Sequence, residues 1–271
     1  MKIAALIVAL AAALQAPDDT QHVIARLDAY MAAYEPRLSE LVADERMDQT
    51  VRMSARGLSN RRVLISEVAF IALPNAGWTG FRHVRSVNNR GVSKSTRSLE
   101  ATLKMPTMDA ARALLRDSAA HNLGLARTTN LPNLPLEFLH VRNRHRMAAR
   151  ADGQVMVRGV ETTRIVFEEN STPTLIKNPS TDADMPAEVR AWIDRGGRLL
   201  RAEVTTFSAA RKLPYEHLVR VEFVESQALG GLLVPSEMYE EFPVQHPYSG
   251  TAEATYSNFR KFQTSARIVP Q

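Results

Sequence analysis

The second half of this chain alternates apolar and polar residues, and this period of two restricts the fold more than any other feature. The stretch AWIDRGGRLLRAEVTTF (191–207) combines one extended run, a Gly196-Gly197 turn and a second extended run. The same alternation continues through 215–224, 232–242 and 251–262. One apolar and one polar face are typical of strands in an antiparallel sheet that is covered on a single side. From residue 144 onward the chain is therefore predicted to form one antiparallel meander.

Strand patterns also occur earlier in the chain. Residues 38–53 have an extended but mixed pattern, and residues 62–73 form a strongly β-prone run. The sequence PNAG at 74–77 predicts a turn before a further strand. NNRG at 88–91 predicts a hairpin turn, since Asn and Gly tolerate positive φ. In the strand between these turns, Trp78, Gly80, Arg82 and Val84 are predicted to share one face.

Three segments have helical patterns. In residues 18–35 the apolar residues recur at spacings of three and four, which predicts an amphipathic helix that Pro36 ends. Residues 107–124 predict a second helix, capped by Thr107 and stopped by Gly124. A shorter piece, LPLEFLHV (134–141), is predicted to pack nearby, and RNRHR (142–146) to return the chain to a strand. These elements together predict an α+β fold.

The first sixteen residues are typical of an export signal. Lys2 supplies a positive charge, and an apolar run extends from Ile3 to Leu14. This run is within the length of a signal core and shorter than the ~20 residues that a membrane-spanning helix needs. A short N-terminal membrane anchor is the alternative interpretation. We expect a cleaved signal peptide at 1–16, a single domain at 17–271 that does not span the membrane, and a periplasmic or secreted protein. The chain has no cysteine, which excludes lipid attachment through that residue.

The net charge of +5 does not by itself indicate a nucleic-acid-binding protein. The basic residues are interleaved with acids along most of the chain, which is typical of a solvated surface. Aromatic residues are too dispersed to form a platform for stacking bases. Without cysteine there is no thiol catalysis and no thiolate metal site. No cofactor or nucleic-acid partner is expected.

No catalytic motif stands out. The sequence has no nucleophile elbow and no phosphate-binding glycine loop. His140 and His145 are five residues apart without a third ligand close by, so no metal site is predicted. The pairs Glu168-Glu169 and Glu240-Glu241 point their side chains to opposite faces of a strand. No catalytic residue is assigned, and an enzyme is the less favoured interpretation.

The basic sequence RNRHR (142–146) is a candidate for recognition of an anion. Guanidinium groups bind phosphate or carboxylate head groups through charge-assisted hydrogen bonds. Arg142, Arg144 and Arg146 are therefore candidates for an anionic head-group site. A solvated turn is the alternative interpretation, and it is favoured.

The hairpin at 192–204 resembles one in the outer-membrane lipoprotein carrier-like proteins, the LolA- and LppX-like half-barrels. Residues 234–238 (VPSEM) and 250–259 (GTAEATYSNF) resemble the closing strands of that family. The likeness covers roughly the last 110 residues. It implies a strongly curved antiparallel sheet, an open half-barrel, with N-terminal and middle helices packed on an apolar concave face. Members of that family bind lipid or acyl chains and are not enzymes. The chain is also similar to a group of exported bacterial proteins without an assigned activity, which implies no function.

Two segments depart from the family's pattern, the helical insertion at 96–140 and the basic residues at 142–146. Both could fill the cavity and abolish a carrier function. Three hypotheses remain open: a non-enzymatic protein that holds a lipid-like ligand in a half-barrel cavity, a protein-interaction module of the cell envelope, and a hydrolase whose acids converge only in three dimensions. For the first, the alternation selects as cavity candidates Trp78, Val84, Phe167, Leu200, Val204, Val221, Phe223 and Tyr256. These residues could equally pack on the helices.

Overall fold

A computed structural model describes residues 20–53, 57–73, 77–92, 116, 118–124, 127, 129–178, 181–208, 215–245 and 248–261, apart from the side chains of 71–79 and 243–248. The described strands are β1 (Leu41–Met53), β2 (Leu58–Leu73), β3 (Gly77–Val87), β4 (Arg90–Gly91), β5 (Met147–Val157), β6 (Val160–Glu169), β7 (Ala187–Asp194), β8 (Leu199–Thr206), β9 (His217–Ser226), β10 (Leu232–Gln245) and β11 (Tyr248–Lys261). The described helices are α1 (Thr20–Leu38), α4 (Leu134–Leu139) and the short 3-10 helices η1 (Val141–Arg146) and η2 (Gln227–Leu229).

All eleven strands belong to one open antiparallel sheet, in the order β4-β3-β2-β1-β11-β10-β9-β8-β7-β6-β5. It consists of two meanders, β1 to β4 and β5 to β11. The meanders are joined where β1 pairs with β11, from Leu41 opposite Lys261 to Met53 opposite Tyr248. The predicted fold class and the C-terminal meander are therefore confirmed.

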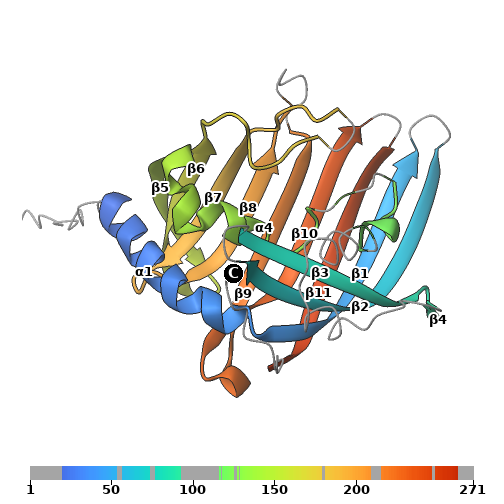
Figure 1. Ribbon diagram of the computed structural model, residues 1–271, viewed down its shortest axis with the longest axis horizontal. Helices are drawn as coiled ribbons and strands as arrows, with labels where there is room; N and C mark the ends of the chain where they lie inside the picture. Colours follow the sequence, from blue (N-terminus) through green and yellow to red (C-terminus); the bar gives the residue numbers. More distant parts are fainter. Residues whose placement is uncertain are drawn as a thin grey trace, which may run out of the picture.

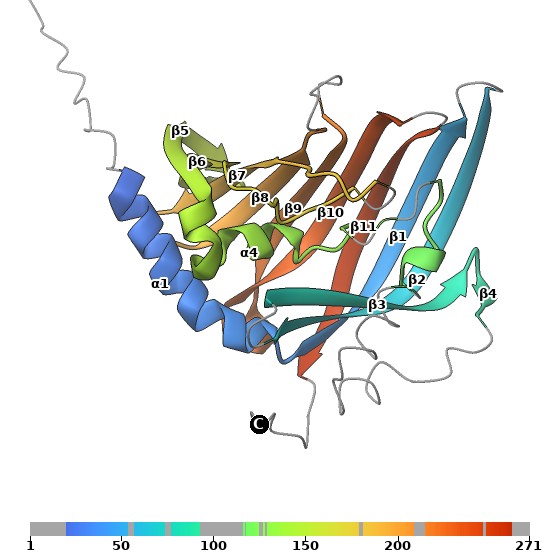
Figure 2. The ribbon, with the colours of Figure 1, turned by 45° about the horizontal axis from the view of Figure 1, so that its top comes forward.

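The sheet is strongly curved, and its concave face holds the helices (Figure 1). Strand β3 crosses in front of the other strands, while α1 runs along one side of the hollow (Figures 1 and 2). Helix α1 contacts β2, β5 and β10, and α4 contacts β3 and β8. The two helices therefore lie inside the curve of the sheet and cover much of its apolar face.

Two predicted boundaries are wrong. Helix α1 continues through Pro36 to Leu38. The proline removes one backbone N–H donor, but the side chain of Leu38 is completely buried and the N–H of Ser39 donates to the carbonyl of Glu35 at 3.0 Å. Residues 142–146 form part of η1 instead of a strand. The backbone N–H of Arg142 donates to Nδ1 of His140 at 3.1 Å and that of Asn143 to the carbonyl of His140 at 2.9 Å, so the chain turns here before β5 begins.

The middle helix predicted for 107–124 lies mostly outside the described residues. Residues 118–120 are helical, and Gly124 has φ +74°, which suits the predicted stop. The shorter helix predicted at 134–141 is present as α4, Leu134–Leu139.

The hairpin of β7 and β8 provides a docking point for α1. One carboxylate oxygen of Asp194 accepts from the backbone N–H groups of Gly196 and Arg198, at 2.9 and 2.8 Å. Gly197 adopts φ +83°, and a Cβ at this residue would lie 2.4 Å from the carbonyl oxygen of Arg26 in α1. The glycine turn therefore lets the helix backbone approach the sheet directly.

Candidate functional site

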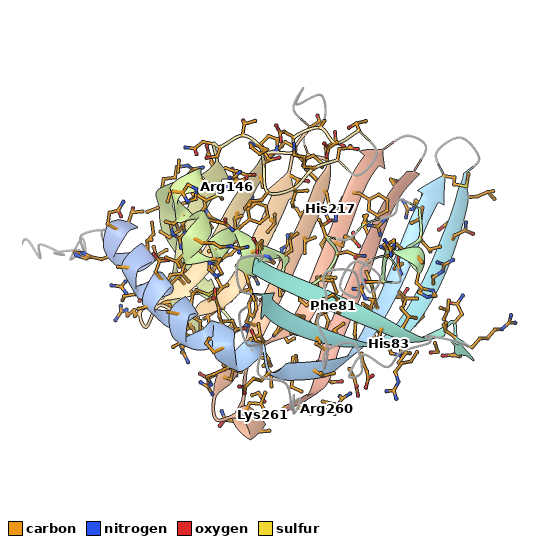
Figure 3. The ribbon with its side chains drawn as sticks, viewed as in Figure 1. Phe81, His83, Arg146, His217, Arg260 and Lys261 are labelled. Atoms are coloured by element: carbon orange, nitrogen blue, oxygen red, sulfur yellow. The ribbon has the colours of Figure 1, made fainter. Side chains whose placement is uncertain are left out.

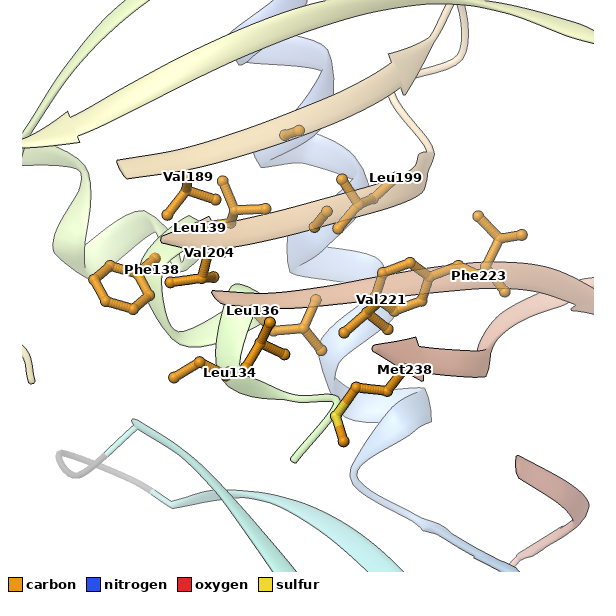
Figure 4. Packing of buried hydrophobic residues seen from close by; sticks show 14 of the residues in the cluster. Leu134, Leu136, Phe138, Leu139, Val189, Leu199, Val204, Val221, Phe223 and Met238 are labelled. Atoms are coloured by element: carbon orange, nitrogen blue, oxygen red, sulfur yellow. The ribbon is translucent and has the colours of Figure 1, made fainter. Parts of the chain in front are cut away.

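The concave face is apolar across its middle strands. Phe167 of β6 pairs with Val189, Val189 with Val204, and Val204 with Val219, so their side chains form a row across four strands. All four are at most 1 % exposed. The apolar side chains of α4 pack into this surface (Figure 4). They are Leu134, Leu136, Phe138 and Leu139.

The predicted cavity residues lie on this face where they are described. Seven of the eight belong to one buried cluster with α1 and α4, and none of the seven is more than 7 % exposed. They are Val84, Phe167, Leu200, Val204, Val221, Phe223 and Tyr256. The side chain of Trp78 is outside the described residues. The seven side chains pack against their neighbours in the cluster. A ligand on the concave face would therefore have to replace part of that packing.

Polar residues occupy the same face next to the apolar row. The row continues from Val219 to Glu240, whose side chain is completely buried. In β1, Glu45 lies opposite Tyr256 on one side and Ser66 on the other. These residues occupy positions that the alternation assigns to the core.

One buried ion pair joins β1 to β3. The guanidinium of Arg82 donates to both carboxylate oxygens of Glu45, at 2.5 and 2.8 Å, and both side chains are inaccessible to solvent. Arg82 also donates to the backbone carbonyl of Asn130 at 2.8 Å. Burial alone would lower the pKa of Arg82, but the Glu45 carboxylate outweighs burial and raises it. Arg82 therefore keeps its positive charge within the core.

A second buried ion pair joins Arg127 to Glu240 of β10. The Nε of Arg127 donates to Glu240 at 2.5 Å, and Nε2 of His217 lies 2.8 Å from the same carboxylate oxygen. The guanidinium of Arg127 also lies 4.3 Å from the centre of the Phe242 ring. Burial raises the pKa of Glu240, but Arg127 and His217 outweigh it and lower the pKa to about 2.

Residues 118–146, where described, form a covering segment over the concave face. At its start, the N–H of Leu123 donates to the side chain of Gln49 at 2.9 Å, and Arg62 donates to the carbonyl of His121 at 2.8 Å. Further along the segment, Arg127 donates to Glu240, and the backbone carbonyl of Asn130 accepts from Arg82. The first part of the covering segment is thus fixed to the sheet by polar contacts.

The three predicted head-group arginines lie at the other end of the covering segment, where Arg142 makes a pair within the segment and Arg144 and Arg146 attach it to other elements. Arg142 pairs with Glu137 at 2.5 Å, Arg144 pairs with Asp28 of α1, and Arg146 lies 3.4 Å from Glu169 of β6. The guanidinium of Arg144 also lies 4.7 Å from the centre of the Phe167 ring. Each arginine has a different acidic partner, so an anionic head group would have to compete with these contacts.

The convergence of Glu240 and His217 bears on the hydrolase hypothesis. A carboxylate whose pKa is about 2 is a weak proton acceptor near neutral pH. Both side chains are buried, and Arg127 shares the carboxylate. Among the described residues, no group of three His, Asp or Glu could hold a metal ion. The arrangement suits a structural role better than proton transfer.

We expect Glu240 to contribute to acid sensitivity. Its pKa falls from 4.5 to about 2 on folding, so its contribution is complete above the unfolded value and is lost as pH falls from about 4.5 toward 2. This loss amounts to something on the order of 3 kcal/mol. Urea unfolding of the wild type and of Glu240→Gln at a series of pH values would measure it. The variant should be less stable at neutral pH and should lose less stability on acidification, whereas parallel curves would contradict this role.

No family model matches the chain, and no curated protein matches it. Among solved structures, it is similar to a domain described as an outer membrane lipoprotein-sorting protein from Vibrio parahaemolyticus, with 10 % identity, TM-score 0.47 and coverage of 92 % of this chain and 96 % of that one. A DUF1329 family protein from Desulfovibrio piger has 11 % identity, TM-score 0.45 and coverage of 90 % and 94 %. A LolA superfamily protein from Nitrosomonas europaea has 11 % identity, TM-score 0.39 and coverage of 92 % and 96 %.

All three TM-scores are below 0.5 and all three identities are near 10 %, so these likenesses carry no argument about this chain. At such identities and TM-scores no ligand or partner is transferred from these structures to this chain. No helix among the described residues is long and apolar enough to span a membrane.

Proposed function

We propose that this chain is an exported, non-enzymatic carrier that holds a hydrophobic or lipid-like ligand on the concave face of its sheet. The observation that carries this proposal is the position of α4. Its four apolar side chains occupy the hollow of the sheet as an acyl chain would (Figure 4). The helix is only six residues long and is flanked on both sides by polar anchors.

The energetics favour replacement of α4 by a ligand over spontaneous opening. Moving four buried apolar side chains into water costs roughly 6–12 kcal/mol. An acyl chain that occupies the vacated surface recovers much of this cost, since it buries a comparable apolar area. Binding would then move the covering segment away from the sheet, while the chain reversal at η1 stays attached to α1 through Arg144 and Asp28.

An engineered disulfide tests whether the ligand enters beneath α4. A Cβ at Gly80 of β3 would lie 3.0 Å from Cγ of Asn133, the residue before α4. In a disulfide, the Cβ of one cysteine lies about 3 Å from the sulfur of the other, so Gly80→Cys with Asn133→Cys suits a crosslink. The chain has no other cysteine, and the crosslink would hold α4 against β3.

We expect the reduced double variant to bind the methyl ester of dansylated undecanoic acid, a neutral fluorescent amphiphile. The oxidised variant should bind it at least about tenfold more weakly, because the covering segment cannot leave. Reduction of the crosslink should restore binding. Equal binding by both forms would exclude entry beneath α4. Native mass spectrometry with organic extraction, on protein exported to a periplasm and purified without detergent, would identify a co-purified lipid.

A role as an interaction module without a small ligand is the alternative. Strand β5 is the last strand at one edge of the described sheet, and an uncovered edge would favour this role. However, β5 has a register shift between Ala151 and Gln154 and carries Arg150 and Asp152. Bulges and charges of this kind oppose pairing with another strand, so this edge gives the interaction role little support.

A further inference from the structure

A pocket of about 380 Å³ lies at the end of the sheet where α1 finishes and the turn between β9 and β10 begins. Lys261, at the end of β11, lies at this edge of the molecule (Figure 3). The volume is within the range of small-molecule sites. We refer to this hollow as the portal pocket.

The floor of the portal pocket is apolar. It is formed by Leu41, Leu229 and Leu232. Leu41 and Leu232 are 2 % and 4 % exposed and belong to the same hydrophobic cluster as the concave face. Leu229 is partly buried against that cluster. An alkyl chain on this floor would therefore lie next to the apolar interior beneath α1.

The rim of the portal pocket carries more positive than negative charge. Arg37 and Lys261 contribute two cations and Glu40 one anion. Arg37 donates to the carbonyl of Leu229 at 3.0 Å, which keeps its guanidinium beside the floor. Lys261 lies 3.9 Å from Glu40, and these side chains are 73 % and 60 % exposed. So exposed and distant a pair is weak, and an anion can therefore compete with Glu40 for Lys261.

We propose that the portal pocket binds the head group of a single-chain anionic amphiphile, such as a long-chain carboxylate. The carboxylate lies between Arg37 and Lys261, and the first carbons of the chain lie on the three leucines. The position of the tail rests on the proposed carrier function, since the rest of the chain would continue onto the concave face. Head-group binding does not depend on that function.

The test compares dansylated undecanoic acid with its methyl ester, which has the same chain without the charge. We expect the acid to bind about tenfold more tightly at low salt, in keeping with charge-assisted contacts to two cations. Lys261→Gln should remove most of this preference and leave the affinity for the ester unchanged. Added salt should weaken binding of the acid alone, since the rim is exposed.

Lys177→Gln is the matched control. Lys177 pairs with Asp184 at 3.0 Å in the connection between β6 and β7, at the opposite ends of the strands from the portal pocket. This variant loses the same charge and should keep the preference for the acid. Leu232→Trp places a larger side chain on the floor of the portal pocket and changes no charge. This variant should also weaken binding of the acid.

The outcomes separate this proposal from the carrier proposal. If the wild type prefers the acid and Lys261→Gln abolishes this preference, the portal pocket is supported. If the preference for the acid persists in the oxidised Gly80→Cys/Asn133→Cys variant, the head-group site is independent of α4. Equal binding of acid and ester, unaffected by Lys261→Gln, overturns the portal pocket while the carrier proposal stands. If neither probe binds, both are overturned.

Discussion

Replacement of Arg82 with methionine is expected to lower the free energy of unfolding by about 3–5 kcal/mol. The substitution keeps much of the side-chain volume but leaves the Glu45 carboxylate buried without its cation. The backbone carbonyl of Asn130 loses a donor as well. Urea unfolding should show a lower midpoint with an unchanged slope, since the folded structure and its buried surface are retained.

The double variant Arg82→Met with Glu45→Met is the control. Two apolar residues of similar size can replace a buried ion pair at little cost, so the double variant should recover most of the lost stability. A single variant that loses less than about 1 kcal/mol would show that the pair contributes no more than an exposed one. A double variant as unstable as the single one would place the loss in packing instead of charge.

The sheet could be predicted from the sequence because its signal is local. Alternation along each strand shows which residues share a face, and the glycine turns show where strands end. The alternation correctly placed Arg82 on the face of Val84, on the concave side. It gave no reason for an arginine there, because its partner Glu45 is 37 residues earlier in the chain.

The buried polar network shows where local reasoning stops. Arg127 and Glu240 are 113 residues apart, and only the fold of the covering segment brings them together. A signal was present, since Glu45, His217 and Glu240 occupy core positions of their strands. The acidic partners of Arg144 and Arg146 in the basic sequence at 142–146 could not be predicted from the sequence either. They are Asp28 and Glu169, which lie on other elements of the fold.

Substitution of Gly197 with alanine is expected to lower the free energy of unfolding by about 2–4 kcal/mol. A left-handed conformation disfavours any residue with a Cβ, and Gly197 has φ +83°. Here the Cβ would also lie 2.4 Å from the carbonyl oxygen of Arg26, which is backbone and cannot rotate away. Helix α1 must therefore shift from the hairpin. Urea unfolding would measure the loss, and hydrogen exchange of the amides in α1 would show the local loosening.

Gly159→Ala separates backbone strain from displacement of α1. Gly159 lies in the turn between β5 and β6 with φ +79°, and a Cβ there would contact nothing within 4 Å. This variant should lose only about 1–2 kcal/mol, the cost of the left-handed conformation alone. Exchange in α1 should not change. If the two variants were equally destabilised, the close approach of α1 to the hairpin would contribute nothing. A larger loss for Gly197→Ala, with faster exchange in α1, would show that the glycine turn positions the helix that covers the concave face.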